Sequence, residues 1–586
     1  MCGIAGIMTS TGAPPDRGLL DVMVAALGHR GPDGAGVHIR DSIGLGHTRL
    51  AIMDLSTGDQ PLFGPEGICL VANGEIYNNP ELRRHLNQEE FSTQSDCEPP
   101  LFLYYRLGID FAQYLRGMYA IALYDPRAKR LLLMRDPFGI KPLYYAETTI
   151  GLVFASEPRA ILATGLLTRR IRPDVRDELL QTQFTSGAST IFEGIQRVLP
   201  GETIIIENGF IKDRRLLPGL PVKGTSALDL EGAIAGFETV WRDSIEKHQR
   251  SDVPYGMFLS GGIDSSAVLA MMAQMNDRPV LAYTAYFPGT SVQDERVYAR
   301  RVAEVTGAEH IEVKVEQSDF WDLLPFIAAS IDDPVADYAV VPTFKLASVA
   351  HRAVKVILSG EGGDELFGGY GRYRSAALRP KLLRKPMRHS GHFDRLGVLR
   401  EVNPLWQDGI LRARRAAHHE QRTLLQRCQA EDCVDWLPND LLNKLDRCLM
   451  AYGIEGRVPF VDPKVAAFGF TLPDALKIHK KSGKWVLRHW LDKKLPQSEP
   501  FAPKRGFTVP VQDWMRARPG LGALVAAQPF IAEFCHGAKV EALFRSSEKR
   551  AGLAAWTLLF YALWYRHHIL GQAPAGDVFE TLAQKV

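Results

Sequence analysis

A serine- and glycine-rich string, SGGIDSS at 260–266, follows a short apolar run at 257–259 and precedes a helix-like segment at 267–274. Its glycines leave backbone N–H groups open to an anion, its serines add hydroxyl donors, and the start of a helix favours negative charge. The string therefore predicts a phosphate-binding loop between a strand and a helix. It is not of the Walker type, because the chain contains no GxxxxGK[ST] string. Taken alone, such a turn could be only a tight strand-to-helix connection.

Strands and helices are expected to alternate around this loop. Apolar runs at 280–286 and 354–358 are typical of strands, 294–306 is typical of a helix, and a long amphipathic helix is expected at 228–248. Alternation of this kind predicts βαβ units and a mostly parallel sheet. From about residue 375 onward the sequence has a helical character.

The first third of the chain has a different pattern. Apolar, strand-like runs bounded by turn residues occur at 68–71, 118–124 and 130–134, and 19–27 has helical spacing. This part is therefore expected to be rich in β-structure.

The length of 586 residues is too great for one hydrophobic core and indicates at least two domains. A stretch rich in Pro and Gly at 218–225 indicates a linker. We expect a first domain over 2–208, a linker over 209–227, a second domain over 228–570 and a C-terminal tail over 571–586.

Composition excludes several classes of function. Lys plus Arg number 69 and Asp plus Glu 67, which gives no electrostatic reason to expect nucleic acid or an anionic membrane as a partner. Seven cysteines with irregular spacing and no CxxC pair argue against a disulfide framework and a zinc site, and favour a reducing, cytoplasmic setting. We identify no signal peptide and no apolar stretch long enough to span a bilayer.

Cys2 is a candidate nucleophile. A small residue in second position suits removal of Met1, which would place a thiol and an α-amine on the same residue. The amine has an unperturbed pKa of about 7.7–8.0, so it could act as a base near neutral pH. The thiolate would attack a carboxamide carbon, and the resulting oxyanion would need hydrogen-bond donors held in place. Many proteins begin with an unreactive cysteine, so the neighbouring motifs decide between the two interpretations.

Those motifs resemble the class II glutamine amidotransferases, the N-terminal-nucleophile glutaminases, over about residues 2–205. The matching strings are HRGPDG at 29–34, GHTRL at 46–50, NGEIYN at 73–78, SD at 95–96 and RDPFGIKPLYY at 135–145. The resemblance implies an α+β Ntn-hydrolase sandwich with αββα layers. It also implies that Cys2 is the nucleophile.

The same resemblance assigns the glutamine-binding residues. The Asn73 side chain and the Gly74 backbone N–H would form the oxyanion hole, where a glycine permits close approach of the backbone. Arg49 would hold the α-carboxylate of glutamine, for which a planar guanidinium is well shaped. Asp96, with Glu75 as helper, would hold the α-ammonium group. Alternatively, Arg49 and Asp96 could form ordinary surface ion pairs.

The SGGxDS string resembles the PP-loop of ATP pyrophosphatases, which cleave ATP between the α- and β-phosphates. With the second glycine-rich loop at 359–370, this resemblance implies ATP or pyrophosphate binding by Leu259, Ser260, Gly261, Gly262, Asp264, Ser265, Ser266, Ser359, Gly360 and Glu361.

That second loop, SGEGGDELFGGY, resembles the signature of asparagine synthetases. Asp264, Asp364 and Glu365 are suited to holding Mg²⁺ on pyrophosphate, because hard cations prefer oxygen ligands. By resemblance Glu361 lies at the reacting centre, where it would guide or deprotonate ammonia. An acidic loop between glycines could otherwise be a solvated turn, but its place directly after an apolar strand argues against this.

Lys484 is the family lysine expected near the adenylate, where it would stabilise negative charge as pyrophosphate leaves. The alternative is a solvated lysine in the basic run 477–484. Further matching strings are DP at 333–334, Asp337 with PT at 342–343, DR at 446–447, GIEGRVPFVD at 453–462, LR at 487–488 and KRGF at 504–507.

Over about residues 2–565 the chain resembles glutamine-hydrolysing asparagine synthetases. The resemblance implies that ammonia from glutamine is joined to aspartate activated by ATP, that no tightly bound organic cofactor is required, and that a homodimer is plausible. We also expect an apolar passage for ammonia between the domains. Tyr338 and Ala339 depart from the family pattern, and 375–430 matches no pattern.

Three interpretations stay open. The first is asparagine synthetase, and the second is an enzyme of the same architecture acting on another carboxylate, such as a peptide, a cell-wall precursor or a secondary-metabolite acid. The third is an inactive regulatory relative. It is disfavoured by the intact set Cys2, Asn73, Asp96, Asp264 and Glu361.

Overall fold

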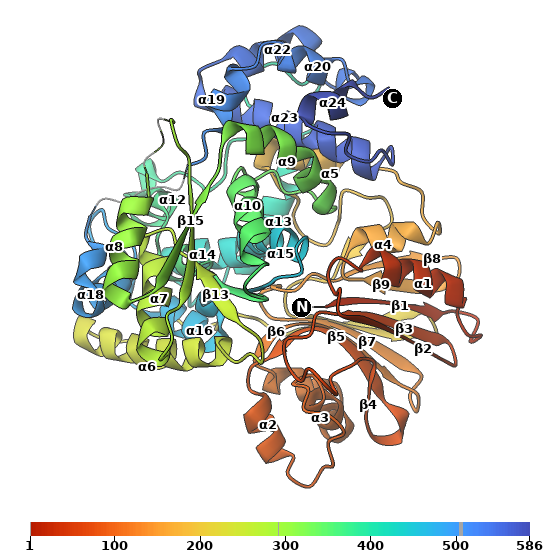
Figure 1. Ribbon diagram of the computed structural model, residues 1–586. Coiled ribbons are helices and arrows are strands. Elements are labelled where there is room, and N and C mark those ends of the chain that lie inside the picture. The colour runs from red at the N-terminus through yellow and green to blue at the C-terminus, as the bar shows by residue number, and fades with distance from the viewer. Residues whose placement is uncertain (1, 291, 293, 503–507, 586) are drawn as a thin grey trace.

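Two six-stranded antiparallel sheets form the first part of the computed structural model, which describes residues 2–290, 292, 294–502 and 508–585 (Figure 1). One sheet has the order β10-β8-β9-β1-β3-β2, with β1 (Gly3–Thr9), β2 (Gly34–Arg40), β3 (Ile43–Arg49), β8 (Tyr144–Thr148), β9 (Gly151–Ala155) and β10 (Gln196–Arg197). The other has the order β12-β11-β7-β6-β5-β4, with β4 (Leu62–Phe63), β5 (Cys69–Ile76), β6 (Gly117–Asp125), β7 (Arg130–Arg135), β11 (Glu202–Glu207) and β12 (Phe210–Leu216).

The two sheets pack face to face, and helices cover both outer faces. Fully buried apolar side chains fill the space between the sheets, among them Ile4, Leu45, Val71, Ala122 and Phe154. Helices α1 (Arg17–Ala26) and α4 (Pro158–Ala163) cover one outer face, and α2 (Asn79–His85) and α3 (Pro99–Leu107) cover the other (Figure 1). This arrangement confirms the predicted αββα sandwich.

The sandwich extends further along the chain than the sequence suggested. Strand β12 pairs with β11 and is the outermost strand of its sheet, whereas the sequence predicts that its residues belong to the linker. Its side chains are mostly exposed, so it carries little of the apolar pattern by which the other strands were recognised.

The second part of the chain contains a five-stranded parallel sheet of order β15-β14-β13-β16-β17. Its strands are β13 (Tyr255–Phe258), β14 (Leu281–Tyr286), β15 (Glu309–Lys314), β16 (Val356–Leu358) and β17 (Glu455–Arg457). In Figure 1, helices α7 (Ile263–Met275) and α8 (Arg296–Thr306) lie on one side of these strands, and α10 (Val340–Ala350) lies on the other. The predicted α/β parallel-sheet domain is confirmed, with β17 as a strand that the sequence did not indicate.

Helices make up most of the remaining chain, as expected. They include α6 (Leu230–His248), α9 (Gln317–Ser330), α11 (Gly363–Phe367), α13 (Asp408–Ala417), α14 (Leu424–Val434), α15 (Asn443–Met450), α16 (Pro463–Thr471), α18 (Trp485–Lys494), α19 (Val511–Arg516), α20 (Leu521–Ala526), α22 (Gly537–Arg545), α23 (Lys549–His568) and α24 (Val578–Ala583). Val578 and Leu582 of α24 are buried, so this part of the predicted tail packs against the body of the protein. No helix within the described ranges is long and apolar enough to cross a membrane. The KRGF string at 504–507 lies outside the described residues.

Candidate active sites

The backbone of Cys2 is fixed at both of its polar groups. Cys2 directly precedes β1, whose pairing with β3 places Gly3 opposite Thr48. The Cys2 N–H donates to Asn73 Oδ1 at 3.1 Å, and Arg30 Nε donates to the Cys2 carbonyl oxygen at 3.2 Å. The candidate nucleophile is therefore held at the start of its strand by a side chain from the facing sheet and by an arginine.

Asn73 presents a buried hydrogen-bond donor beside Cys2. Its side chain is fully buried, and its Oδ1 accepts from Cys2, while Nδ2 has no hydrogen-bond partner among the described residues. Gly74, which follows it on β5, faces the neighbouring strand so closely that a Cβ atom would lie 2.0 Å from the Met118 carbonyl oxygen. A buried donor beside a sulfur nucleophile is what a developing oxyanion requires.

The thiol of Cys2 needs a base. Burial raises its pKa above the ordinary value, and the carboxylates of Glu455 and Glu75 raise it further, against a lowering by a backbone hydrogen bond from Leu50. The thiol is therefore protonated near neutral pH. An attack by sulfur must remove this proton, which is the task that the sequence assigns to the α-amine.

Two buried carboxylates lie in the same site. Burial raises the pKa of Asp96 to about 6, although a hydrogen bond of 2.5 Å from the Ile76 N–H to Asp96 Oδ2 opposes the shift. The pKa of Glu75 is raised well above its ordinary value, first by burial and then by Asp96 and Glu455. Buried carboxylates that repel one another favour a bound cation such as an α-ammonium group. Asp96 therefore does not form the surface ion pair of the alternative interpretation.

Arg49 is engaged with the protein itself. Its Nη1 lies 2.7 Å from Asp59 Oδ1, and its Nη2 donates to the carbonyl oxygen of Asp54. Asp59 is largely exposed, so this ion pair is held weakly enough for a substrate carboxylate to compete. Arg49 lies at the end of β3, next to Leu50, whose backbone lowers the pKa of the Cys2 thiol.

A second site is a cavity of about 350 Å³ at the carboxyl ends of β13 and β16. In open α/β sheets, ligands bind at this end of the strands. Both predicted loops line the cavity, through Leu259, Ser260, Gly261, Gly262, Asp264, Ser265, Ser359, Gly360 and Glu361. Ser266 differs from the prediction, because it is fully buried within α7 and does not line the cavity.

The two loops touch each other. A Cβ atom on Gly360 would lie 2.9 Å from the Cβ of Asp264, and a Cβ on Gly261 would lie 2.8 Å from the Ala299 backbone nitrogen. Gly261 also has a φ of +70°, in the left-handed region that favours glycine. The glycines thus let the backbone come close on both sides of the cavity.

Lys484 lies in this cavity and not in solvent. Its Nζ forms ion pairs with Asp264 and, at 2.7 Å, with Asp364. Burial alone would lower the pKa of Lys484, but the two carboxylates raise it above the ordinary value, so the side chain is cationic. The interpretation of a solvated lysine in a basic run is therefore wrong for this residue.

The structure brings two of the three predicted metal ligands together. Asp264 and Asp364 both line the cavity, and two carboxylates beside a phosphate site suit Mg²⁺, which takes few protein ligands and several phosphate or water oxygens. Glu365 does not line the cavity: its Oε1 accepts from the Tyr370 hydroxyl at 2.6 Å, and burial raises its pKa to about 8. Across the described residues, no cluster of three or more His, Cys, Asp or Glu side chains is arranged to hold a metal ion.

The sequence did not single out Lys444. This residue of α15 lines the cavity, and its Nζ lies 2.8 Å from Asp337 Oδ2. Burial raises the pKa of the nearby Glu361, and Lys444 opposes that shift. Its position two residues before the matched DR string is the sequence signal by which Lys444 could have been identified as a site residue.

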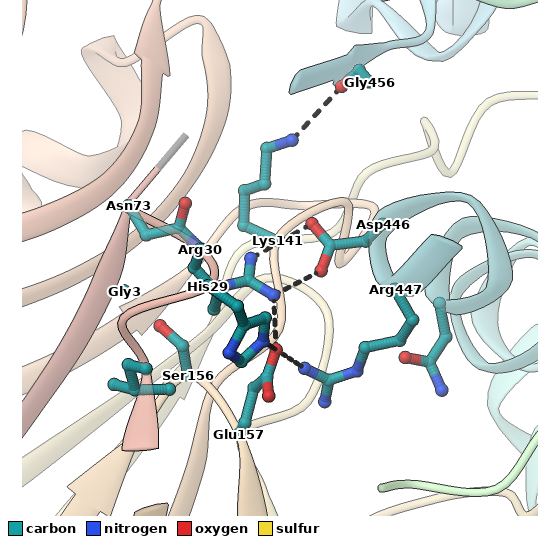
Figure 2. A network of polar contacts seen from close by, with 12 residues as sticks. Gly3, His29, Arg30, Asn73, Lys141, Ser156, Glu157, Asp446, Arg447 and Gly456 are labelled. Atoms are coloured by element: carbon teal, nitrogen blue, oxygen red, sulfur yellow. Dashed lines mark hydrogen bonds and ion pairs between the residues drawn. The ribbon is translucent and has the colours of Figure 1, made fainter. Parts of the chain in front are cut away.

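A buried charge network joins the sandwich to the second domain (Figure 2). Arg30 Nη1 lies 2.8 Å from both Glu157 Oε1 and Asp446 Oδ2, and Arg447 lies 2.5 Å from Glu157 and 3.0 Å from Asp332. Because Arg30 also binds the Cys2 carbonyl, the position of the nucleophile depends on a carboxylate from α15. Arg30 and the DR string both lie in matched motifs, but their sequence does not show that they meet.

The family model described as "Asparagine synthase" matches residues 236–566. The chain belongs to the asparagine synthase family. The model described as "Glutamine amidotransferase domain" matches residues 1–216 and therefore includes β12. Both domains recognised from motifs are confirmed.

Relatives match over most of the chain. A Mycobacterium tuberculosis protein provisionally named as a glutamine-hydrolysing asparagine synthetase is 34% identical, over 96% of this chain and 97% of its own. "Asparagine synthetase [glutamine-hydrolyzing] 1" of Bacillus subtilis is 30% identical, over 88% of each chain. "Amidase chry2" of Gibberella zeae is 32% identical, over 64% of this chain and 60% of its own.

Proposed function

We propose that this protein is a glutamine-dependent asparagine synthetase. It hydrolyses glutamine to glutamate and ammonia, converts aspartate and ATP to β-aspartyl-AMP and pyrophosphate, and aminates the adenylate to asparagine and AMP. The observation that carries the proposal is the cavity in which Asp264, Glu361 and Lys484 meet between two glycine-rich loops. In the same chain, Cys2 is the nucleophile that releases ammonia from glutamine.

Glutamine hydrolysis begins at Cys2. After removal of Met1, the α-amine of Cys2 takes the thiol proton as sulfur attacks the carboxamide carbon. The oxyanion is stabilised by Asn73 Nδ2 and the Gly74 N–H. Ammonia leaves with a proton returned by the amine, and water then hydrolyses the thioester to glutamate.

Aspartate activation takes place in the cavity. A β-carboxylate oxygen attacks the α-phosphorus of ATP, and pyrophosphate leaves toward the Ser260–Ser265 side of the cavity, where Lys484 supplies positive charge. Asp264 and Asp364 would hold a Mg²⁺ ion, which when bound neutralises charge on pyrophosphate. Ammonia then attacks the activated carbonyl, Glu361 accepts its proton, and AMP departs. Its raised pKa makes Glu361 a stronger base than an ordinary carboxylate.

A product assay tests the proposal. The purified protein is incubated with ATP, Mg²⁺, aspartate and glutamine, and asparagine, AMP and pyrophosphate are measured. Equal amounts of asparagine and AMP are expected, and Cys2→Ala should lose the glutamine-driven reaction while keeping the ammonia-driven one. Glutamate release without asparagine would leave the glutaminase standing and contradict the aspartate assignment.

A second candidate is amidation of a different carboxylate acceptor. Amidase chry2 is 32% identical over 64% of this chain, an identity close to that of the synthetases over a shorter match, so relatives at this identity carry different names. Tyr338 and Ala339, which depart from the family pattern, directly precede α10. Ala339 lines the cavity. A panel of peptide, cell-wall and metabolite acids, scored by pyrophosphate release, separates the two candidates.

Removal of Met1 is required by this mechanism. We expect mass spectrometry of the purified protein to show Cys2 as the first residue. If Met1 stays, the amine of Cys2 is an amide nitrogen and cannot accept the thiol proton, so retained Met1 in a protein that hydrolyses glutamine would contradict the proposed base.

We also propose a cytoplasmic location, which suits the seven cysteines, all of them free thiols.

A further inference from the structure

We propose that Arg457 is a positioning residue that couples the glutaminase site to the ATP cavity. It belongs to β17 in the second domain, yet its side chain reaches the glutamine-binding carboxylates of the first. The inference rests on the proposed function, because it concerns how glutamine hydrolysis and aspartate activation affect each other.

On the glutaminase side, Arg457 binds the residue that follows the oxyanion hole. Its Nη2 forms an ion pair of 3.4 Å with Glu75 Oε1, and Glu75 directly follows Gly74 on β5. Its Nε donates to Glu455 Oε1 at 2.6 Å. Arg457 is fully buried, so both interactions take place away from water and are weakly screened.

On the synthetase side, the backbone of Arg457 holds the second glycine-rich loop. Arg457 pairs with Leu358 of β16, and the Ser359 N–H donates to the Arg457 carbonyl oxygen at 2.9 Å. Ser359, Gly360 and Glu361 then line the ATP cavity. A single residue thus contacts Glu75 through its side chain and the cavity loop through its main chain.

The guanidinium has little freedom to move independently of its strand. Its Nη1 donates to the carbonyl oxygens of His248 at 2.9 Å and Arg250 at 2.6 Å, at the end of α6. With Glu455 on Nε and Glu75 near Nη2, both sides of the fork are occupied. A displacement of Glu75 would therefore shift β17 as a whole, together with the loop that begins at Ser359 and is hydrogen-bonded to Arg457.

The buried charges around Glu75 explain how bound glutamine would displace this residue. Three buried carboxylates lie together here: burial, Asp96 and Glu455 raise the pKa of Glu75, and burial and Glu455 raise that of Asp96. The α-ammonium of bound glutamine would add a positive charge to this group and bind the Glu75 carboxylate that Arg457 holds in place. Glutamine would thereby change the interaction that orients β17, and occupation of the cavity would act on Glu75 in return.

A matched control is available in Arg116. This arginine is also largely buried and crosses between the domains, with Nε 2.8 Å and Nη2 2.9 Å from the carboxylate oxygens of Asp462. Neither its contacts nor those of Asp462 include Glu75, Asp96 or Ser359. Arg116→Gln should therefore weaken the domain interface without acting on either site.

The experiment compares full-length wild type, Arg457→Gln, Arg457→Lys and Arg116→Gln. Glutamate release is measured against glutamine concentration, with and without ATP and aspartate, and pyrophosphate release is measured with ammonia. In wild type, ATP and aspartate should stimulate glutamate release. In Arg457→Gln, the KM for glutamine should rise about 10- to 100-fold, as expected for loss of a buried charged contact, and the stimulation should disappear. Arg457→Lys should be intermediate, because lysine keeps the charge but lacks the fork.

Arg116→Gln should keep both the KM and the stimulation, even if its melting temperature falls as far as that of Arg457→Gln. Glu75→Gln is measured alone and combined with Arg457→Gln, and the double variant should raise the KM by less than the product of the two single effects, since the two residues share one interaction. Equal effects of the Arg116 and Arg457 variants, or multiplicative effects in the double variant, would overturn the proposal, as would a wild type without stimulation. If Arg457→Gln does not fold, Arg457→Lys gives the same comparison. Absence of amide product from any acid would contradict the proposed function, while the KM for glutamine would still report on Arg457.

Discussion

Replacement of Asn73 by alanine is expected to slow glutamine-driven glutamate release by about 10²–10³-fold through kcat, the cost typical of losing one oxyanion-hole donor. The reason is the buried Nδ2 atom, which has no acceptor among the described residues and lies on the side chain that bonds the Cys2 N–H. A donor without a partner is unfavourable in the resting protein. It becomes useful when the substrate oxygen acquires charge. Ammonia-driven synthesis should persist, because the ATP cavity is built from other residues.

Alanine also removes the acceptor for the Cys2 N–H, so a second variant is needed. Asn73→Asp keeps an oxygen that can accept from Cys2 and loses the donor. If the donor is what matters, both variants should have low kcat values, and Cys2→Ala should be lower still. A variant that raises KM for glutamine while keeping kcat would show that Asn73 only binds substrate, and would contradict the oxyanion-hole assignment.

Features that depend on neighbouring residues were predictable from the sequence. The SGGIDSS string, with an apolar run before it and a helical segment after it, required a strand, a loop and a helix, which the structure has as β13, 260–262 and α7. The second loop follows β16 in the same manner. Because parallel strands place their carboxyl ends at one edge of a sheet, two such loops were bound to meet.

Features that depend on the direction of a side chain were not predictable in the same way. Asp364 and Glu365 are adjacent on the short helix α11, where successive side chains point about 100° apart and therefore in different directions. Adjacent acidic residues cannot be told apart from the sequence, and of these two the structure places only Asp364 in the cavity. Contacts between distant segments were equally hidden, such as the approach of Arg457 to Glu75 across the domain boundary.

Lys484→Met is expected to lower ATP–pyrophosphate exchange in the presence of aspartate by about 10²–10³-fold, comparable to the loss of other preorganised charge stabilisation. In the present structure the Lys484 ammonium lies between Asp264 and Asp364 at the wall of the cavity. Methionine of similar length would leave two carboxylates facing the triphosphate without this cation. Glutamate release from glutamine alone should persist, because Lys484 contacts no residue of the Cys2 site.

Lys481→Met is the matched control for this prediction. Lys481 lies three positions earlier in the same basic run, but its side chain is exposed, so its replacement should leave the exchange rate within about twofold of wild type, as is usual for surface changes of small energetic effect. Removing one partner of a buried ion pair also destabilises proteins, so the melting temperature of each variant must be measured. If Lys484→Met stays folded and both variants lose exchange equally, the effect belongs to the net charge of the run. If neither loses exchange, Lys484 takes no part in the departure of pyrophosphate, and its ion pairs with Asp264 and Asp364 only hold the two loops together.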